Sequence, residues 1–341
     1  MPDIILTVHD LLRKEFQDAE LRELVGPRLI FEGMFPHVAA DAPTVAYFAD
    51  KFTAYTHPDK AFPAPRTSEG EFATVKIQTR LDRKYATLTG FGMAIEYGPD
   101  VRRYTKDIDE VVRGQQLFAA WLAEYVNNKT AADVTNDWAV GTAAIDADAG
   151  LQNLYPSATA SGVGYEKKRK FLEINQASAN AWDQTASDPI KDILRMKLVV
   201  AKQTNSDGAR YPYRLTDLFV DVEEHTYVAE RLINKTNTVW QQSPFVPGVA
   251  VPVIFGVTLT PVDFSFMNSA GVVQSNKALG FDRSAKAATI YESFDPQFGR
   301  AGPFNTNQYT RDEDHVTVYQ AWSERVTALK TPKALLLVDG I

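Results

Sequence analysis

Hydrophobic and polar residues alternate without interruption from residue 73 to residue 82, which predicts a β-strand with two different faces. One face carries Ala73, Val75, Ile77, Thr79 and Leu81, and the other carries Thr74, Lys76, Gln78, Arg80 and Asp82. A second, more apolar strand is predicted over residues 85–97. Such a long two-faced ribbon is better suited to gripping a neighbouring subunit than to holding an active site.

The ribbon leads into a long amphipathic helix. After Gly98-Pro99-Asp100 and the basic run 101–106, apolar residues recur at helical spacing and predict a helix over residues 107–127. Asp107 as N-cap, with Glu110 three residues later, matches a capping box. At 1.5 Å per residue this helix would span about 30 Å, which is long enough to support a flat domain.

The segment before the ribbon is predicted to be a helix followed by an arm. The helix covers residues 7–24 and stops at Gly26-Pro27. Residues 28–43 are apolar with scattered Gly and Pro, which indicates an extended arm lying on another surface. β-prone residues 44–56 then lead to a proline-rich loop tip. Residues 44–97 therefore form one β-excursion, whose apolar side chains a lone hairpin could not bury.

The second half of the chain mixes helices and strands. Ser187-Asp188-Pro189 starts a helix to residue 202 that is expected to bury Ile190, Ile193, Leu194, Leu198 and Ala201. Strands are predicted at 218–222, 249–266, 287–294, 315–329 and 334–338, with a helix at 223–233 and a Gly/Pro/Asn loop at 299–308. Residues 130–185 are expected to hold short helices and a mobile loop around 158–165.

Composition describes a globular protein. The 341 residues are 45% hydrophobic and 23% charged, which excludes wholesale disorder and favours two domains or one elaborate domain. The net charge of −7 argues against a general nucleic-acid binder. Cysteine is absent, which excludes disulfides, thiolate metal sites and cysteine nucleophiles. Without a signal peptide or an apolar run of roughly 20 residues, the protein is expected to be intracellular while it is made.

No residue pattern indicates catalysis, a cofactor or a metal. The five histidines lack zinc spacing. Glu223-Glu224-His225 is the strongest cluster, yet two acids at a helix start already interact favourably with the helix dipole. Residues 146–150 lack the third acid, the glycine and the closing Glu of a calcium loop. Gly162-Val163-Gly164 is neither a phosphate loop nor a dinucleotide fingerprint, and the basic run 167–170 after it is interpreted as a solvated helix face.

The order of these elements resembles the major capsid proteins of tailed bacteriophages and archaeal tailed viruses, the HK97-like fold. The likeness is strongest at residues 74–125, 218–233 and 287–338, and the stretch from Val316 to Leu335 is similar to the usual ending of the family. The resemblance implies an α+β fold with an N-terminal arm, an extended β-ribbon (the E-loop), a spine helix in a peripheral domain, and an axial α/β domain.

The resemblance also implies domain boundaries. Residues 1–43 would be the N-terminal arm and 44–97 the E-loop. Residues 98–185 and 281–329 would form the peripheral domain, and 186–280 and 330–341 the axial domain. Many family members carry a scaffolding segment that a protease removes. Because this chain begins with Met1 directly in the arm, the expectation is a separate scaffolding protein or a trimmed coding sequence.

The residues expected at contacts between subunits lie on the arm and the E-loop. They are Leu29, Ile30, Phe31, Phe35, Phe48, Phe52, Tyr55, Glu69, Glu71, Val75, Lys76, Ile77, Arg80 and Arg83. The charged members are interpreted as inter-subunit ion pairs that fix register and partner choice. Gly98 and Pro99 are expected to form a hinge that lets one sequence occupy hexameric and pentameric positions.

The implied function is self-assembly, through hexamers and pentamers, into an icosahedral virion shell around double-stranded DNA, without sequence-specific binding. Assembly would take place in the host cytoplasm. Expected partners are further copies of the chain, a portal, a separate scaffolding protein and a decoration protein, with no membrane, cofactor or metal. Three alternatives stay open. They are an encapsulin-type compartment, which shares the fold but encloses a cargo enzyme, a tail or decoration subunit, and a soluble hydrolase with a site assembled from scattered residues.

Overall fold

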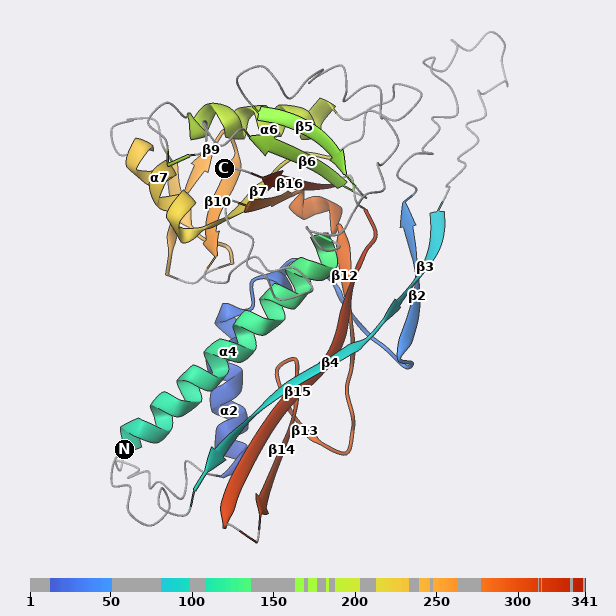
Figure 1. Ribbon diagram of the computed structural model, residues 1–341, viewed down its shortest axis with the longest axis vertical. Coiled ribbons are helices and arrows are strands. Elements are labelled where there is room, and N and C mark those ends of the chain that lie inside the picture. Colours follow the sequence, from blue (N-terminus) through green and yellow to red (C-terminus); the bar gives the residue numbers. More distant parts are fainter. Residues whose placement is uncertain are drawn as a thin grey trace, which may run out of the picture.

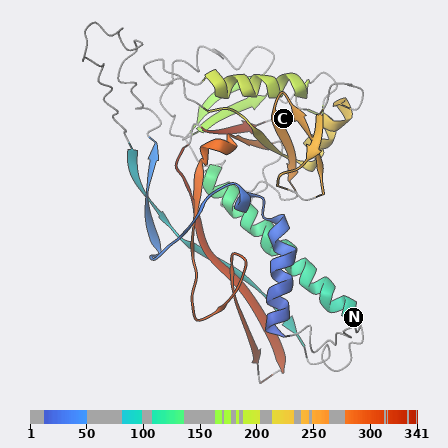
Figure 2. The ribbon, with the colours of Figure 1, turned by 180° about the vertical axis from the view of Figure 1, so that it is seen from behind.

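The computed structural model describes residues 13–50, 81–98, 108–135, 163–168, 171–176, 182–183, 188–202, 213–232, 239–245, 248–262, 277–311, 313, 315–331, 334–339 and 341. These residues form a six-stranded sheet, an eight-stranded sheet and a separate two-stranded ribbon (Figure 1). The long helix α4 (Ile108–Thr135) runs along the six-stranded sheet toward the eight-stranded sheet. Helix α2 (Lys14–Val25) lies along α4, as the view from behind shows (Figure 2).

The six-stranded sheet is organised around one long strand, β15 (Val316–Leu329). Strands β14 (Phe304–Arg311) and β12 (Ala288–Ser293) pair with successive parts of β15, and β4 (Thr89–Tyr97) pairs with residues 317–325 of its other edge. The short strands β13 (Gly299–Ala301) and β1 (His37–Ala39) extend the sheet beside β14 and β12. The arm and the stretch after the ribbon are thus joined to one sheet.

The eight-stranded sheet is mixed, with the order β5-β6-β16-β11-β7-β10-β9-β8. Its strands are β5 (Val163–Lys168), β6 (Phe171–Gln176), β7 (Asp217–Asp221), β8 (Val239–Gln242), β9 (Ala250–Ile254), β10 (Val257–Val262), β11 (Lys277–Phe281) and β16 (Leu335–Asp339). Helices α6 (Pro189–Lys202) and α7 (Val222–Leu232) pack against it and share an apolar core with it. Asp188 begins α6, because its carboxylate accepts a hydrogen bond from Lys191 N at 3.3 Å.

A second apolar core joins the two sheets. The period-two alternation of β7 sends Leu218 and Val220 toward α6 and α7, and sends Phe219 into this junction. There Phe219 meets the arm, the end of α4 and strand β12. The arm itself contains two 3₁₀ turns, η1 (Gly26–Arg28) and η2 (Phe31–Gly33), and a third turn, η4 (Arg283–Ala285), follows β11. A third core lies between α2, α4 and the six-stranded sheet.

Several predicted elements are confirmed. Helices α6 and α7 and strands β7, β12, β15 and β16 agree with the predicted bounds to within two residues. Helix α4 runs eight residues beyond the predicted end at residue 127. The extension follows from burial, because Ala131 and Val134 are fully buried in the core that joins the two sheets.

Other expectations are wrong. Residues 299–308 are not a loop, because β13 and β14 form a hairpin there through a turn at Gly302, whose φ of 59° suits glycine. Residues 163–168, which were expected in a mobile loop and a helix face, form strand β5. β5 and β6 also join the eight-stranded sheet rather than the domain of the spine helix, because β6 pairs in parallel with β16.

The predicted strand 85–97 is two strands. β3 (Leu81–Thr87) pairs with β2 (Thr44–Asp50) to form the ribbon, whereas β4 pairs with β15. The close approach of β4 to β15 requires glycine at position 92, since a Cβ there would lie 2.6 Å from Trp322 Cβ. The ribbon therefore ends at Thr87 and does not extend to Tyr97.

Candidate assembly surfaces

The ribbon β2–β3 has one half-buried face and one exposed face. Its antiparallel register places Val45 opposite Ala86 and Tyr47 opposite Lys84, and all four side chains are half-buried. On the other face Ala46 lies opposite Tyr85 and Phe48 opposite Arg83, and all of them are exposed. The ribbon stands beside the two sheets in Figure 1. Its exposed face is therefore available to another molecule.

Two large aromatic residues dominate this exposed face. Phe48 is 58% exposed and Tyr85 is 64% exposed. They sit at diagonal positions across the strand pair, where long side chains lie within reach of each other. The Arg83 guanidinium lies 5.4 Å from the centre of the Tyr85 ring, so the charge borders the apolar surface without interrupting it. We call Ala46, Phe48, Arg83 and Tyr85 the ribbon face.

Only part of the predicted contact set lies in the described ribbon. Phe48 and Arg83 lie on the ribbon face. Phe52, Tyr55, Glu69, Glu71, Val75, Lys76, Ile77 and Arg80 lie outside the described residues, as does Pro99. Gly98 is half-buried, its φ lies outside the left-handed region, and an added Cβ would meet nothing within 4 Å. The sequence analysis did not predict Tyr85 as a contact residue. Tyr85 follows Arg83 by two residues, however, and the two therefore share one face of the strand.

The arm residues of the contact set are buried within the subunit itself. Leu29 is 7% exposed, Ile30 2%, Phe31 1% and Phe35 4%. Phe31 stacks on Phe35 at 5.9 Å between ring centres and meets the edge of Phe219 at 5.7 Å. The expectation of an extended arm lying on a neighbour differs from this arrangement, because the end of α4 and both sheets of the same chain cover these side chains. They leave little surface for a second subunit.

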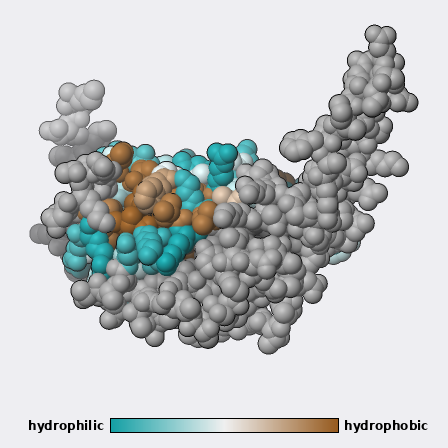
Figure 3. Space-filling model, turned by 90° about the horizontal axis from the view of Figure 1, so that it is seen from above, coloured by the Kyte–Doolittle hydropathy of each residue, from teal (hydrophilic) through white to brown (hydrophobic). Residues whose placement is uncertain are grey.

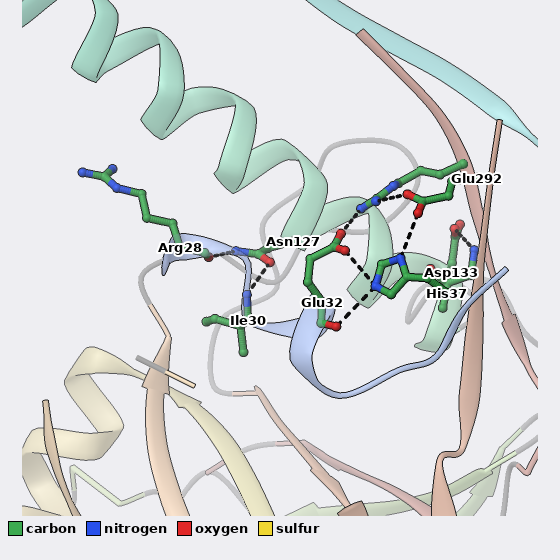
Figure 4. Close-up of polar contacts among 9 residues, drawn as sticks. Arg28, Ile30, Glu32, His37, Asn127, Asp133 and Glu292 are labelled. Carbon is green, nitrogen blue, oxygen red and sulfur yellow. Dashed lines mark hydrogen bonds and ion pairs between the residues drawn. The ribbon is translucent and has the colours of Figure 1, made fainter. Parts of the chain in front are cut away.

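A side chain of α4 fixes the first turn of the arm. Asn127 is 2% exposed, its Oδ1 accepts from Ile30 N at 3.2 Å, and its Nδ2 donates to Arg28 O at 2.8 Å (Figure 4). Both backbone groups of an irregular, buried segment are thereby satisfied. The sequence could not assign this role to Asn127, because its partners are almost a hundred residues away.

The exposed residues of two helices form further apolar surface. On α4, Leu117, Trp121 and Tyr125 are spaced four residues apart and are 47%, 55% and 49% exposed. On α6, Leu194 and Leu198 are 45% and 43% exposed. The expectation that Leu194 and Leu198 lie on a buried face is therefore wrong.

The reason on α6 is a rotation of its buried face. Ile193 fills the core as expected, together with Met196 and Val200, whereas Ala201 is exposed. An apolar area bordered by polar residues is visible from the side of α6 and the β9–β10 turn (Figure 3). Phe255 in that turn is 52% exposed, with a φ of 51°.

Among the described residues, no cluster of three or more His, Asp or Glu side chains could hold a metal ion. A shallow hollow of about 330 Å³ on the six-stranded sheet is lined by Gly92, Met93, Ala94, Gln320, Ala321 and Trp322, none of which titrates. No helix in the described part of the chain is both long enough and apolar enough to cross a bilayer.

The Glu223-Glu224-His225 cluster is structural. Asp221 accepts from Glu223 N at 3.3 Å at the start of α7, which is an N-capping contact. Burial raises the pKa of Glu224 and lowers the pKa of His225, so both groups shift toward their neutral forms. The buried atoms Glu224 Oε2 and His225 Nε2 have no hydrogen-bond partner among the described residues.

The combination of a long helix along a sheet, a projecting β-ribbon and a second helix-covered sheet is the HK97-like capsid fold. Among solved structures, the chain is similar to an encapsulin of Synechococcus elongatus in its holo-SrpI complex. The TM-score is 0.52 at 9% identity, over 91% of this chain and 86% of that chain.

Capsid structures of a GTA particle show a comparable likeness. The native and the empty particle each give a TM-score of 0.50, at 12% and 14% identity, over 91% of this chain and 89% of theirs. No family model matches the sequence, and no curated protein matches it either. The likeness therefore concerns the fold.

Proposed function

We propose that this protein is a major capsid protein, which self-assembles through hexamers and pentamers into an icosahedral shell enclosing double-stranded DNA. The observation that carries the proposal is the ribbon face. It presents Phe48 and Tyr85, at 58% and 64% exposure, on a two-stranded ribbon of a fold that other proteins use for shells. An exposed apolar patch of this kind is typical of a protein–protein interaction site.

The proposed mechanism is burial rather than chemistry. Covering the exposed half of one large aromatic side chain removes on the order of 100 Å² of surface, or about 2.5 kcal/mol. Two such side chains give a modest contact for one pair of subunits. A closed shell repeats the contact many times, and simultaneous contacts hold each subunit far more tightly than any single one.

We propose that each sheet belongs to one of the two domains. We assign the six-stranded sheet with α4 to the peripheral domain and the eight-stranded sheet with α6 and α7 to the axial domain. Residues 163–176 then belong to the axial domain, because β5 and β6 continue its sheet. Gly98 and Pro99 stay a proposed hinge between the ribbon side and the spine helix.

The partners we propose are further copies of the chain, a portal, a separate scaffolding protein and a decoration protein. The shell would assemble in the host cytoplasm and form the virion surface. The remaining predicted contact residues, from Phe52 to Arg80, are proposed to contact neighbouring subunits.

The first experiment measures particle formation by the purified full chain, using sedimentation and negative-stain microscopy. Closed shells or rings of five and six subunits are expected. The double variant Phe48→Asp/Tyr85→Asp should remain folded and lose these particles, whereas Tyr85→Phe, which keeps the ring, should form them. A chain that stays monomeric even with scaffold-like partners, or a double variant that still assembles, would refute the proposal.

An encapsulin-type compartment is the second candidate, favoured by the match to the Synechococcus elongatus encapsulin. The two functions differ in what the shell encloses. Particles isolated from the native source should contain nuclease-protected double-stranded DNA if the protein is a capsid protein. Particles that contain a single protein cargo and no protected DNA would instead identify a compartment.

A further inference from the structure

Four charged side chains meet where the arm joins the six-stranded sheet, and the proposed function does not use them. Glu32 comes from η2, His37 from β1, Glu292 from β12 and Arg325 from β15. We call them the arm-root ring. Figure 4 shows Glu32, His37 and Glu292 converging beside the end of α4.

The ring is closed, with alternating charges. Arg325 donates to Glu32 Oε1 at 2.6 Å and to Glu292 Oε2 at 3.0 Å. His37 approaches the other oxygen of each acid, with Nε2 at 2.8 Å from Glu32 Oε2 and Nδ1 at 3.1 Å from Glu292 Oε1. Each carboxylate therefore lies between two cations when His37 is protonated.

The two cations of the ring differ in their exposure. The Arg325 side chain is 1% exposed, and a guanidinium does not lose its proton in a protein. The His37 side chain is 29% exposed, and its imidazole can lose a proton. Arg325 is thus the permanent cation of the ring, and His37 is the one that can be switched off.

Hydrogen bonds to Glu292 and Glu32 raise the pKa of His37 to about 10. Burial pushes the pKa of Glu32 upward, but the His37 hydrogen bond and the nearby Arg325 charge outweigh burial and lower it. Glu32 and His37 therefore both carry their charges near neutral pH.

The other charged groups around the ring come from α4 and β12. Asp133 lies at the end of α4, accepts from Thr327 N at 2.9 Å and pairs with Lys129. Burial raises the pKa of Asp133. On the β12 side, Lys330 lies over the Tyr291 ring at 5.6 Å. None of these groups makes a described contact with the His37 imidazole. None of them therefore supplies a positive charge in its place when the imidazole loses its proton.

The ring lies at the attachment point of β1. This strand has only three residues and pairs in parallel with β12. Ile290 N donates to Pro36 O at 3.0 Å, and Ala40 N donates to Glu292 O at 2.8 Å. Only residues 40–43 separate β1 from β2, and four residues reach at most about 14 Å. Any movement of β1 would therefore move the base of the ribbon.

We propose that the arm-root ring is a latch that holds β1 on β12, fixes the direction in which the ribbon leaves the subunit, and opens when His37 loses its charge. A neutral imidazole presents a lone pair to one of its two carboxylates. Glu32 and Glu292 then share Arg325 as their one cation, and opposite charges no longer alternate around the ring. Repulsion between the acids frees the arm root.

The test is a spin label on β1. The chain contains no cysteine, so Val38→Cys provides a unique attachment site. Val38 is 42% exposed and points to the opposite side of the strand from His37. The label should be immobilised at pH 7–8 and become mobile with a midpoint near pH 10. For a single-proton step, the ratio of released to docked label changes about tenfold per pH unit.

Two substitutions at His37 separate the latch from a purely structural contact. In His37→Gln, which has no charge, the label should be mobile throughout. In His37→Arg, which keeps its charge, the label should stay immobilised beyond pH 10. A second label at Val239→Cys, on the distant strand β8 and 62% exposed at that position, reports global unfolding.

Three results would overturn the proposal. One is an immobilised label in His37→Gln at pH 7–8, and another is the wild-type alkaline release in His37→Arg. The third is release at Val38 that always coincides with a change at Val239. The readout lies within one subunit, so its outcome does not depend on whether shells form.

Discussion

The arm root and the ribbon are neighbours in sequence but differ in how their apolar and charged groups are satisfied. In residues 29–37, the large apolar side chains fill the cores of the subunit, and Glu32 and His37 pair within the arm-root ring. In the ribbon, which begins at Thr44, Phe48 and Tyr85 remain exposed. One segment is completed by its own chain, whereas the other presents surface that the described residues leave uncovered.

The sequence pattern grouped the arm and the ribbon as one contact surface, and the structure separates them. The arm residues stabilise the folded subunit, so changing them should act on folding. The ribbon residues contribute little to the subunit, so changing them should act on assembly. Substitutions in the two regions therefore separate folding from assembly.

The largest effect is expected from Arg325→Met. This change leaves Glu32 and Glu292 close together at a buried site without their shared cation, and should cost about 3–5 kcal/mol in free energy of unfolding. Urea denaturation of the subunit measures it. Arg311→Met is the matched control, because the Arg311–Glu96 pair at 2.6 Å is exposed on both sides and should contribute less than about 1 kcal/mol. Equal losses in the two variants would contradict a special role for the ring.

A second pair of variants compares phenylalanines in the two regions. Phe31→Ala opens a cavity between Phe35 and Phe219, and should lower the free energy of unfolding by about 3–5 kcal/mol. Phe48→Ala should change it by less than about 0.5 kcal/mol while reducing particle yield in sedimentation. If Phe48→Ala destabilised the isolated subunit as strongly as Phe31→Ala, the ribbon face would have to be covered within the subunit.

Glycines of β4 test where the ribbon ends. In Gly92→Ala the new Cβ would lie 2.6 Å from Trp322 Cβ and 3.0 Å from Ala321 O, which should cost about 1–3 kcal/mol as β4 shifts away from β15. Gly90→Ala is the control, since its nearest neighbour, Glu324 Cγ, is 3.6 Å away. Thermal unfolding distinguishes them. Similar melting temperatures would indicate that β4 is loosely attached, as a ribbon strand would be.

The last prediction concerns the pH dependence of stability at the arm root. The pKa of His37 is raised by folding to about 10 from 6.5, so its stabilisation is complete below pH 6.5 and disappears as pH rises through 10. The difference in free energy of unfolding between wild type and His37→Gln should therefore shrink steadily between pH 7 and pH 10. A constant difference over this range would show that His37 stabilises the arm by packing rather than by charge.

Local periodicity explains which elements could be predicted. The apolar spacing of α6 and α7 and the long β-prone stretch of β15 specify their type and approximate bounds, because such preferences are properties of neighbouring residues. Periodicity predicts less well which face of an amphipathic element is buried. Leu194 and Leu198 fit a helical stripe as well as Met196 and Val200, and only the position of the eight-stranded sheet buries the second pair.

The sequence by itself determined the α+β class, the long helix after the ribbon, the late strands, and the absence of cysteine chemistry. Only the tertiary structure decided that the arm is buried in its own subunit and that β4 leaves the ribbon for the sheet. It also brought Arg325 to Glu32, 293 positions away. The physical reason is that periodicity indicates whether a side chain is apolar and therefore favours burial. Which surface buries it depends on contacts between segments far apart in the chain.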